Sequence, residues 1–151
     1  MRDCFAAFPE KNHRPVRGPD GMKQLCVAPR GENLETVTRF FEECLEEKGA
    51  PLKAVSQVSI AVDELFSNIV RYSGATEVTV GCAVEGGRAV LRFADDGRPY
   101  DPTQKTDPDV TLSAEEREIG GLGIFMVKKI MDGLSYEYSG GRNILTVEKR
   151  W

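Results

Sequence analysis

The chain has 151 residues, of which 40% are hydrophobic and 29% are charged, a composition typical of one soluble globular domain large enough for its own core. Its net charge of −4 argues against a nucleic-acid binder, because such proteins need a basic surface that displaces counterions from phosphate groups. The sequence contains no run of about 18 apolar residues, so we expect a cytoplasmic protein with no membrane-spanning helix and no membrane partner.

The first half of the chain predicts a leader, a strand and two helices. Residues 1–21 contain three prolines and two glycines without periodicity, so we expect an extended or disordered leader. Residues 22–28 are typical of a first strand. Apolar residues recur at spacings of three and four over residues 32–48 and again over about 52–73, which predicts two helices, each with one buried face.

The second half predicts two hairpins and a third helix around a long polar loop. Residues 76–84 and 88–94 flank a Gly-Gly turn and are expected to form an antiparallel hairpin. The loop over residues 95–120 is rich in Asp, Glu and Thr, and loops of this length are commonly functional or disordered. The remaining predicted elements are a helix over residues 122–131 and a closing hairpin with strands 134–138 and 143–149.

The four cysteines argue against a zinc site. Cys4, Cys26, Cys44 and Cys82 include no C-x-x-C pair, and the only histidine in the sequence is His13. No signal peptide precedes them, so we interpret all four as reduced thiols rather than as disulfides. Cys44 and Cys82 fall at apolar positions of predicted elements and are expected to be small core residues.

Glu64 and Asn68 form the first candidate site. They lie four residues apart on the second predicted helix, so their side chains stack one turn above each other beside the apolar stripe. An amide oxygen is a hard ligand that can hold Mg²⁺, and a carboxylate can take a proton from an attacking hydroxyl group or water. Taken alone, the pair is more typical of a solvated helix face, so its weight depends on the motifs that follow.

Two glycine-containing motifs complete the candidate site. Asp95 ends a hydrophobic strand, where its carboxylate can accept a hydrogen bond from the exocyclic amine that distinguishes adenine from guanine, and Gly97 lets a flat base approach the backbone. Further along, Gly121 and Gly123 open a helix whose free backbone N–H groups attract a phosphate that no side chain blocks. Each motif alone is also compatible with a structural role, as an Asp-Gly turn or a glycine-rich helix start.

The order of these motifs resembles the ATP-binding domain of the GHKL superfamily, which includes gyrase, Hsp90, histidine kinases and MutL. Within it, the chain is most similar to the small anti-sigma-factor serine kinases of the RsbW and SpoIIAB type. The likeness rests on residues 96–102 and 120–132, and it covers residues 22–151 as one ATP-binding domain. It implies an α+β fold of the Bergerat type, a two-layer α/β sandwich whose mixed, mostly antiparallel sheet is covered on one face by helices.

The resemblance also implies roles for individual residues. Asn68 would hold the Mg²⁺ that bridges the phosphates of ATP, and Glu64 would be the general base for a serine or threonine hydroxyl on a partner protein. Asp95 would accept the adenine amino group, with Gly97 beside the ring. The backbone N–H groups that would cradle the phosphates belong to Gly121, Leu122 and Gly123.

Further implied roles concern a lid and the last motif. Residues 103–120 would form a lid over the nucleotide. Arg117 is the expected cation beside the γ-phosphate, with Lys128 as the other candidate, although Arg117 is about one residue out of register with the family's basic lid residue. In the last motif, the superfamily's threonine near adenine corresponds in type to Thr146.

The resemblance implies an ATP-dependent serine/threonine-protein kinase that acts as an anti-sigma-factor-type regulator. It would bind Mg-ATP, phosphorylate an anti-anti-sigma partner of the STAS type and bind a sigma factor. Related proteins commonly form homodimers, although no residue of this chain indicates one. Two alternatives stay open: a nucleotide-gated module that sequesters its partner with little or no phosphotransfer, and an interaction domain that binds no nucleotide. A histidine kinase is not expected, because the chain has no room for a dimerisation helix pair with a phosphoacceptor histidine.

Overall fold

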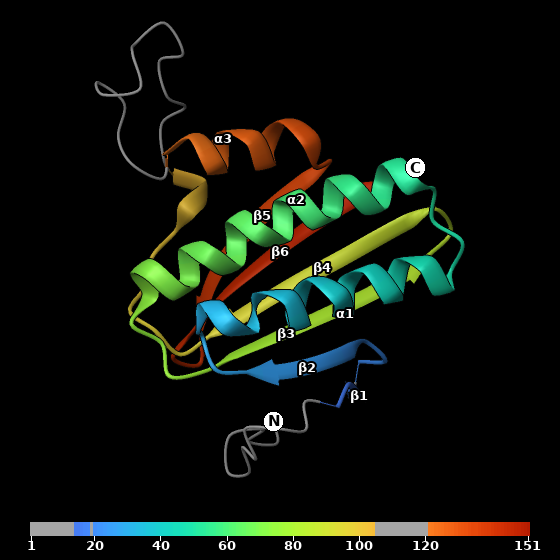
Figure 1. The fold of residues 1–151 in the computed structure, drawn as a ribbon. Coiled ribbons are helices and arrows are strands. Elements are labelled where there is room, and N and C mark those ends of the chain that lie inside the picture. The colour runs from blue at the N-terminus through green and yellow to red at the C-terminus, as the bar shows by residue number, and fades with distance from the viewer. Residues whose placement is uncertain (1–13, 19, 105–120) are drawn as a thin grey trace, which may run out of the picture.

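The computed structural model describes residues 14–18, 20–104 and 121–151, with only the backbone of residues 121 and 122. Within these residues, six strands form one sheet, and helices cover one of its faces (Figure 1). The strands are β1 (Val16–Arg17), β2 (Lys23–Val27), β3 (Val78–Glu85), β4 (Arg88–Asp95), β5 (Gly133–Ser139) and β6 (Arg142–Arg150). The helices are η1 (Gly31–Asn33), α1 (Leu34–Glu47), α2 (Leu52–Asn68), η2 (Ile69–Ser73), η3 (Pro102–Gln104) and α3 (Gly121–Ile130).

The strand pairs of the described sheet are all antiparallel, in the order β1-β2-β3-β4-β6-β5. Both predicted hairpins are present, β3 with β4 and β5 with β6. β1 lies inside the segment predicted as a leader and pairs with β2. The α+β sandwich expected from the sequence is therefore confirmed, and its sheet is antiparallel rather than mixed over the part of the chain that the structure describes.

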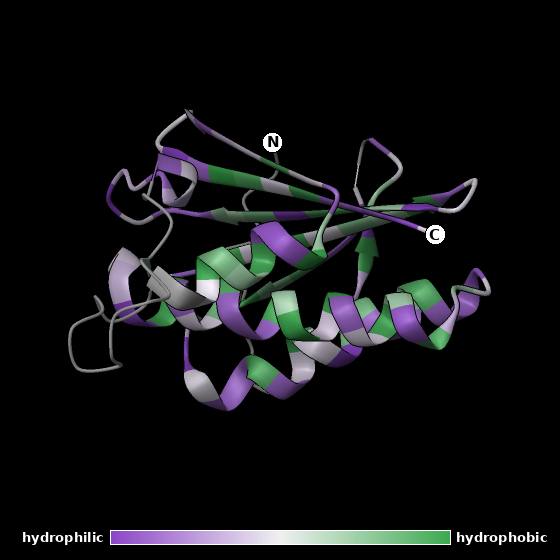
Figure 2. Ribbon diagram, turned by 90° about the horizontal axis from the view of Figure 1, so that it is seen from above, coloured by the Kyte–Doolittle hydropathy of each residue, from purple (hydrophilic) through white to green (hydrophobic). Residues whose placement is uncertain are grey.

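Figure 2 shows the sheet and the helix layer from above, and the buried apolar side chains of the core lie between these two layers. The rings of Phe41 on α1 and Phe93 on β4 meet across this boundary with their centroids 5.4 Å apart. On β4, every second side chain faces the helices and is buried, in the series Ala89, Leu91, Phe93 and Asp95. The alternation of the strand therefore places a carboxylate at the last position of a core-facing row.

The second predicted helix changes its geometry after Asn68. α2 ends at this residue, and residues 69–73 form η2, a π-helical turn, instead of continuing the α-helix to residue 73. The hydroxyl group of Ser73 donates to the carbonyl oxygen of Ile69, and Gly74 follows in the left-handed conformation with a φ of 64°. π-Helical turns occur frequently at functional sites, and this one directly follows a residue selected from the sequence.

Two cysteines follow the sequence-based expectation and one does not. Cys44 and Cys82 are free and buried, as predicted. Cys26 is disulfide-bonded, so the prediction of a reduced thiol is wrong at that position. A disulfide depends on the tertiary proximity of two thiols, which the spacing of cysteines along the chain does not reveal.

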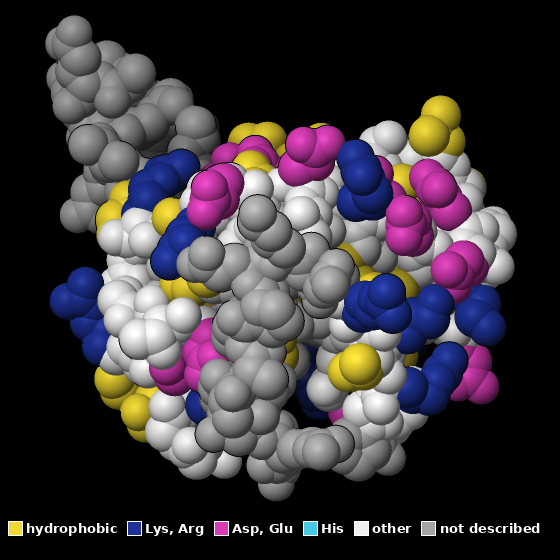
Figure 3. Space-filling view, turned by 60° about the horizontal axis from the view of Figure 1, so that its bottom comes forward, with side chains coloured by type: hydrophobic (Ala, Val, Ile, Leu, Met, Phe, Trp, Pro, Cys, Tyr) yellow, Lys and Arg dark blue, Asp and Glu magenta, His cyan; other side chains and the backbone are white. Residues whose placement is uncertain are grey.

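The surface carries charges of both signs. In the view of Figure 3, Lys and Arg side chains lie next to Asp and Glu side chains along the upper edge and the right-hand side of the face. Ion pairs on the described surface include Arg92 with Asp20 at 2.8 Å and Arg39 with Glu35 at 2.9 Å. Among the helices that the structure describes, none is long and apolar enough to cross a membrane.

Candidate functional site

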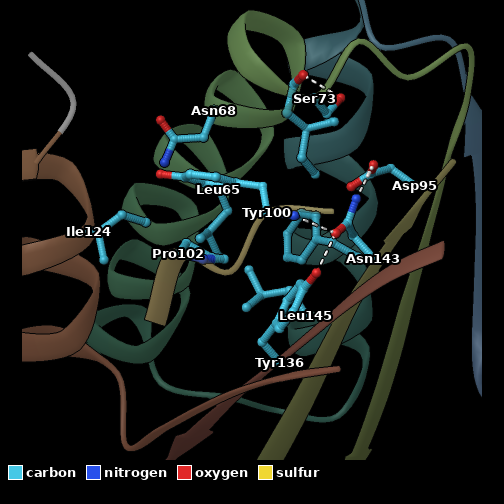
Figure 4. Close-up of a pocket in the computed structure, with 12 residues that line it drawn as sticks. Leu65, Asn68, Ser73, Asp95, Tyr100, Pro102, Ile124, Tyr136, Asn143 and Leu145 are labelled. Atoms are coloured by element: carbon cyan, nitrogen blue, oxygen red, sulfur yellow. Dashed lines mark hydrogen bonds between the residues drawn. The ribbon is translucent and has the colours of Figure 1, made fainter. Parts of the chain in front are cut away.

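A pocket lies between the helix layer and the sheet, at the end of α2 (Figure 4). Two residues selected from the sequence, Asn68 and Asp95, line it from opposite layers. Tyr100 and Ile124 belong to the same lining, so the loop after β4 and the first half of α3 also border the pocket. Apolar side chains from both layers complete the lining, among them Leu65, Ile69, Phe93 and Leu145.

Asp95 is the buried carboxylate of this pocket, with 4% of its surface exposed. Its Oδ1 atom accepts hydrogen bonds from the backbone N–H of Gly97 at 2.9 Å and from Nδ2 of Asn143 at 3.1 Å. Burial raises the pKa of Asp95 above its usual value, although both hydrogen bonds act in the opposite direction. Asp95 therefore presents a fixed acceptor to the pocket, and no hydrogen bond from the described residues reaches its second oxygen, Oδ2.

Asn143 holds the loop that follows Asp95. In the sheet it is the register partner of Asp95, on the neighbouring strand β6. Its amide nitrogen also donates to the backbone carbonyl oxygens of Gly97 and Arg98, at 3.3 and 2.8 Å, and its amide oxygen accepts from the backbone N–H of Tyr100 at 3.0 Å. Sequence reasoning missed Asn143, although a polar side chain in phase with the buried residues of its strand was a usable signal.

Gly97 is fitted against the π-helical turn. A Cβ atom at this position would overlap the carbonyl oxygen of Ser73 and would lie 2.8 Å from Oδ1 of Asp95. The next residue, Arg98, donates its backbone N–H to the same carbonyl oxygen at 3.0 Å and its Nε to the carbonyl oxygen of Tyr72 at 3.0 Å. The contacts within the protein thus give a reason for glycine other than the approach of a flat base, which the sequence suggested.

Glu64 and Gly123 meet where α2 packs against α3. A Cβ atom at position 123 would overlap Oε2 of Glu64, so glycine allows the carboxylate to lie against the backbone near the start of α3. Glu64 is half-buried and lies one helical turn before Asn68. The pocket lining includes Asn68 but not Glu64, so the carboxylate stands beside the pocket rather than in its wall.

Thr146 is not brought to the pocket. Its neighbours on β6, Leu145 and Val147, are buried against the helices, so the side chain of Thr146 points to the opposite face of the sheet. Its register partners there are Arg92 and Ser135. The polar residue that β6 contributes to the pocket lies three positions earlier, and it is an asparagine.

The remaining candidates lie along α3 or outside the described part of the chain. Gly121 and Leu122 are the first two residues of α3, so their backbone N–H groups belong to its first turn. Lys128 lies in the last turn of the same helix. Arg117 and residues 105–120 of the predicted lid are outside the residues that the structure describes.

Comparison with known proteins gives relatives that are named as serine-protein kinases. The chain is 32% identical over 97 residues to the serine/threonine-protein kinase BtrW of Bordetella bronchiseptica, in an alignment that covers 60% of this chain and 66% of that protein. It is 30% identical over 105 residues to the serine-protein kinase RsbW of Listeria monocytogenes, with 64% of this chain and 67% of that protein covered. The matched region therefore spans about two thirds of the length of these relatives.

The fold has a counterpart among solved structures. A crystal structure of the RsbU and RsbW domains of a Mycobacterium tuberculosis protein superposes with a TM-score of 0.60 at 19% sequence identity, covering 84% of this chain and 32% of that one. This likeness concerns the fold alone. The family described as the histidine kinase-like ATPase domain matches residues 27–149, which shows that the chain belongs to this family and confirms the resemblance recognised in its motifs.

Proposed function

We propose that this protein is an ATP-dependent serine/threonine-protein kinase that acts as an anti-sigma-factor-type regulator. Its substrate is an anti-anti-sigma protein of the STAS type, and a sigma factor is its second partner. The observation that carries this proposal is the buried carboxylate of Asp95, which offers a fixed acceptor inside the pocket. Relatives named as serine-protein kinases support the reaction class.

Adenine fits the acceptor that Asp95 offers. Its exocyclic amine donates a hydrogen bond, whereas guanine carries a carbonyl oxygen at the same position and would meet the carboxylate with a second acceptor. The apolar side chains in the lining, such as Leu65 and Leu145, suit the faces of a purine ring. The pocket therefore favours ATP over GTP.

The phosphates are proposed to lie at the start of α3. The first N–H groups of a helix have no partner within the helix, and at the start of α3 these groups belong to Gly121, Leu122 and Gly123. Mg²⁺ usually binds one or two protein oxygens together with substrate phosphates, so the amide oxygen of Asn68 suits it as a protein ligand. Within the described residues, no group of three or more His, Cys, Asp or Glu side chains could hold the ion instead.

Glu64 is the proposed general base. Mg-ATP supplies the phosphoryl group, and its magnesium ion supplies positive charge that offsets the negative charge of the phosphates. The carboxylate of Glu64 lies one turn from Asn68 and against Gly123, where it can accept the proton of a serine or threonine hydroxyl. Arg117 stays the proposed cation for the γ-phosphate.

One observation favours a second candidate function, a nucleotide-gated module that sequesters its partner with little or no phosphotransfer. The carboxylate of Glu64 is packed against Gly123 and is not part of the pocket lining. A base in this position needs a hydroxyl group to reach it past α3. If no partner delivers one, the protein would bind ATP and its partner without transfer.

The test combines binding with transfer. Calorimetric titration with Mg-ATP and Mg-GTP measures the affinity of the protein for each nucleotide. Incubation with γ-labelled ATP and a STAS-type protein from the same organism measures phosphotransfer. Glu64→Gln is the diagnostic variant, because it keeps the shape of the side chain and removes the base. The kinase proposal is supported if the parent protein binds ATP and transfers phosphate and if Glu64→Gln abolishes the transfer. ATP binding without transfer supports the gated module, and a parent protein that binds no nucleotide contradicts both.

A further inference from the structure

Asn143 is a buried hub of hydrogen bonds in the wall of the pocket. Its surface is 5% exposed, and it lies in the pocket lining directly beside Asp95. The amide nitrogen faces three acceptors, Oδ1 of Asp95 and the backbone carbonyl oxygens of Gly97 and Arg98. On the other side, the amide oxygen faces two donors, the backbone N–H of Tyr100 and the hydroxyl group of Tyr136.

These contacts fix which oxygen of Asp95 is available to a ligand. The N–H of Gly97 and the amide nitrogen of Asn143 both donate to Oδ1. A partial rotation of the carboxylate would break both hydrogen bonds inside a buried site, where lost hydrogen bonds are costly, and a half-turn only exchanges two equivalent oxygens. Oδ2 is therefore held as the oxygen that stays open to a donor from the pocket.

The arrangement requires a carboxamide at position 143. An aspartate would have the same shape and would still accept from Tyr100 and Tyr136. Its second oxygen, however, would face Asp95 and two backbone carbonyl oxygens, so that an acceptor would meet three acceptors. Only a proton held between the two carboxylates would restore a donor there.

We propose that Asn143 is the positioning residue that makes the pocket selective for a ligand with an amino donor over one with a carbonyl acceptor. It acts through Asp95, by holding Oδ1 inside the protein and leaving Oδ2 for the ligand. For purine nucleotides this means a preference for adenine over guanine. The inference rests on the proposed nucleotide pocket and adds to it a residue that the known motifs of the chain do not include.

The test compares Asn143→Asp with the parent protein and with Asn33→Asp. Asn33 donates to the carbonyl oxygen of Ala28 and is outside the pocket lining, so the control makes the same chemical change elsewhere. Circular dichroism first confirms that each variant folds. Calorimetry with Mg-ATP and Mg-GTP at several pH values then gives the ratio of the two affinities.

We expect Asn143→Asp to lower the affinity for Mg-ATP by about tenfold or more at neutral pH with little change for Mg-GTP, because a charge-assisted hydrogen bond is lost or misdirected. Its ATP affinity should recover as the pH falls, since a shared proton restores the donor. Asn33→Asp should keep the parent ratio within about twofold. A merely structural role would not produce this pH-dependent change in selectivity.

Two results would overturn the inference. A folded Asn143→Asp variant with the parent ratio of ATP to GTP affinity would show that Asn143 does not set selectivity. A parent protein that binds neither nucleotide would remove the pocket assignment and this inference together, so the two failures are distinguishable. If Asn143→Asp does not fold, Asn143→Ser replaces it, because the shorter side chain cannot span Asp95 and Tyr100 and must lower the same ratio.

Discussion

The carboxylate of Glu64 on α2 lies so close to the backbone of Gly123 on α3 that a Cβ atom at position 123 would overlap it unless the carboxylate moved. The two helices meet at this contact, one turn before Asn68 at the edge of the pocket. The position of the proposed base therefore depends on Gly123, the second of the two glycines that open α3. A substitution in α3 is therefore expected to shift the carboxylate of Glu64, although the sequence of α2 is unchanged.

This relationship predicts the effect of Gly123→Ala. The added methyl group must displace the carboxylate of Glu64, and a misplacement of about 1 Å can cost about a hundredfold in rate. We expect phosphotransfer to fall by about that factor while Mg-ATP affinity falls much less. Transfer of labelled phosphate and calorimetry measure the two quantities separately.

Gly31→Ala is the matched control, because a Cβ atom at position 31 would meet nothing within 4 Å. It should leave both phosphotransfer and nucleotide binding unchanged. Transfer at the parent rate in a folded Gly123→Ala variant would mean that the carboxylate of Glu64 is not needed where the structure places it.

Gly97→Ala is predicted to destabilise the fold rather than only the site. Its methyl group would overlap the carbonyl oxygen of Ser73, which already accepts the backbone N–H of Arg98. Forcing a methyl group into a packed site costs roughly 1–3 kcal/mol. Urea unfolding of the variant should show this loss in the free energy of unfolding, and an unchanged midpoint would mean that η2 moves aside without cost.

Local patterns predicted strands β2 to β6, helices α1 to α3 and the position of Asp95. The alternation of β4 carries through to Asp95, so the side on which its carboxylate lies follows from the strand itself. The π-helical turn could not be predicted, because the apolar spacing of the helix continues through Ile69. That turn is fixed by contacts of Ser73 with the loop after β4.

The partner of Asp95 could not be predicted either, because it depends on the register between two distant strands. The hydrogen bond between Asn143 and Asp95 joins residues 48 positions apart in the sequence. Thr146 matched the expected residue type, but it lies an odd number of positions from Asn143, and such a shift turns a side chain to the other face of a sheet. The pairing of β4 with β6, rather than residue type, determines which residue of β6 lies beside Asp95.

The raised pKa of Asp95 predicts how nucleotide binding responds to pH. Burial makes ionisation costlier in the folded protein, so protonation of Asp95 begins at a higher pH than for an ordinary aspartate of pKa 3.8. The ionised carboxylate can accept a hydrogen bond from an amine on either oxygen, whereas protonation turns one oxygen into a donor. The affinity for Mg-ATP should therefore reach its full value well above the raised pKa and fall as the pH drops through it. The same group should lower the free energy of unfolding as the pH rises from 3.8 through the raised pKa, because the folded state holds its proton longer.

Calorimetry at decreasing pH measures the first effect. The phosphates of ATP also titrate, so Asp95→Asn is titrated alongside, because its side chain cannot change charge. The difference between the two pH profiles is then due to the titration of Asp95. Parallel profiles would show that the carboxylate does not contact the ligand.

Asp95→Asn should do more than weaken ATP binding. The N–H of Gly97 and the amide nitrogen of Asn143 both donate to Oδ1, so the new carboxamide must turn its oxygen toward them. Its NH₂ group then takes the place of Oδ2 and offers a donor to the pocket, which suits the carbonyl oxygen of guanine. We expect ATP binding to weaken by about 1–3 kcal/mol and the preference to shift toward GTP.

The ratio of the two affinities in Asp95→Asn is therefore a direct report on the hydrogen bonds around position 95. A loss of ATP binding without any gain in relative GTP affinity would mean that the carboxamide is free to rotate. In that case the donors from Gly97 and Asn143 would not hold the side chain in solution. A shift toward GTP that disappears when Asn143→Asp is added would tie the orientation of residue 95 to its partner on β6, because the second change removes the donor that selects the carboxamide oxygen.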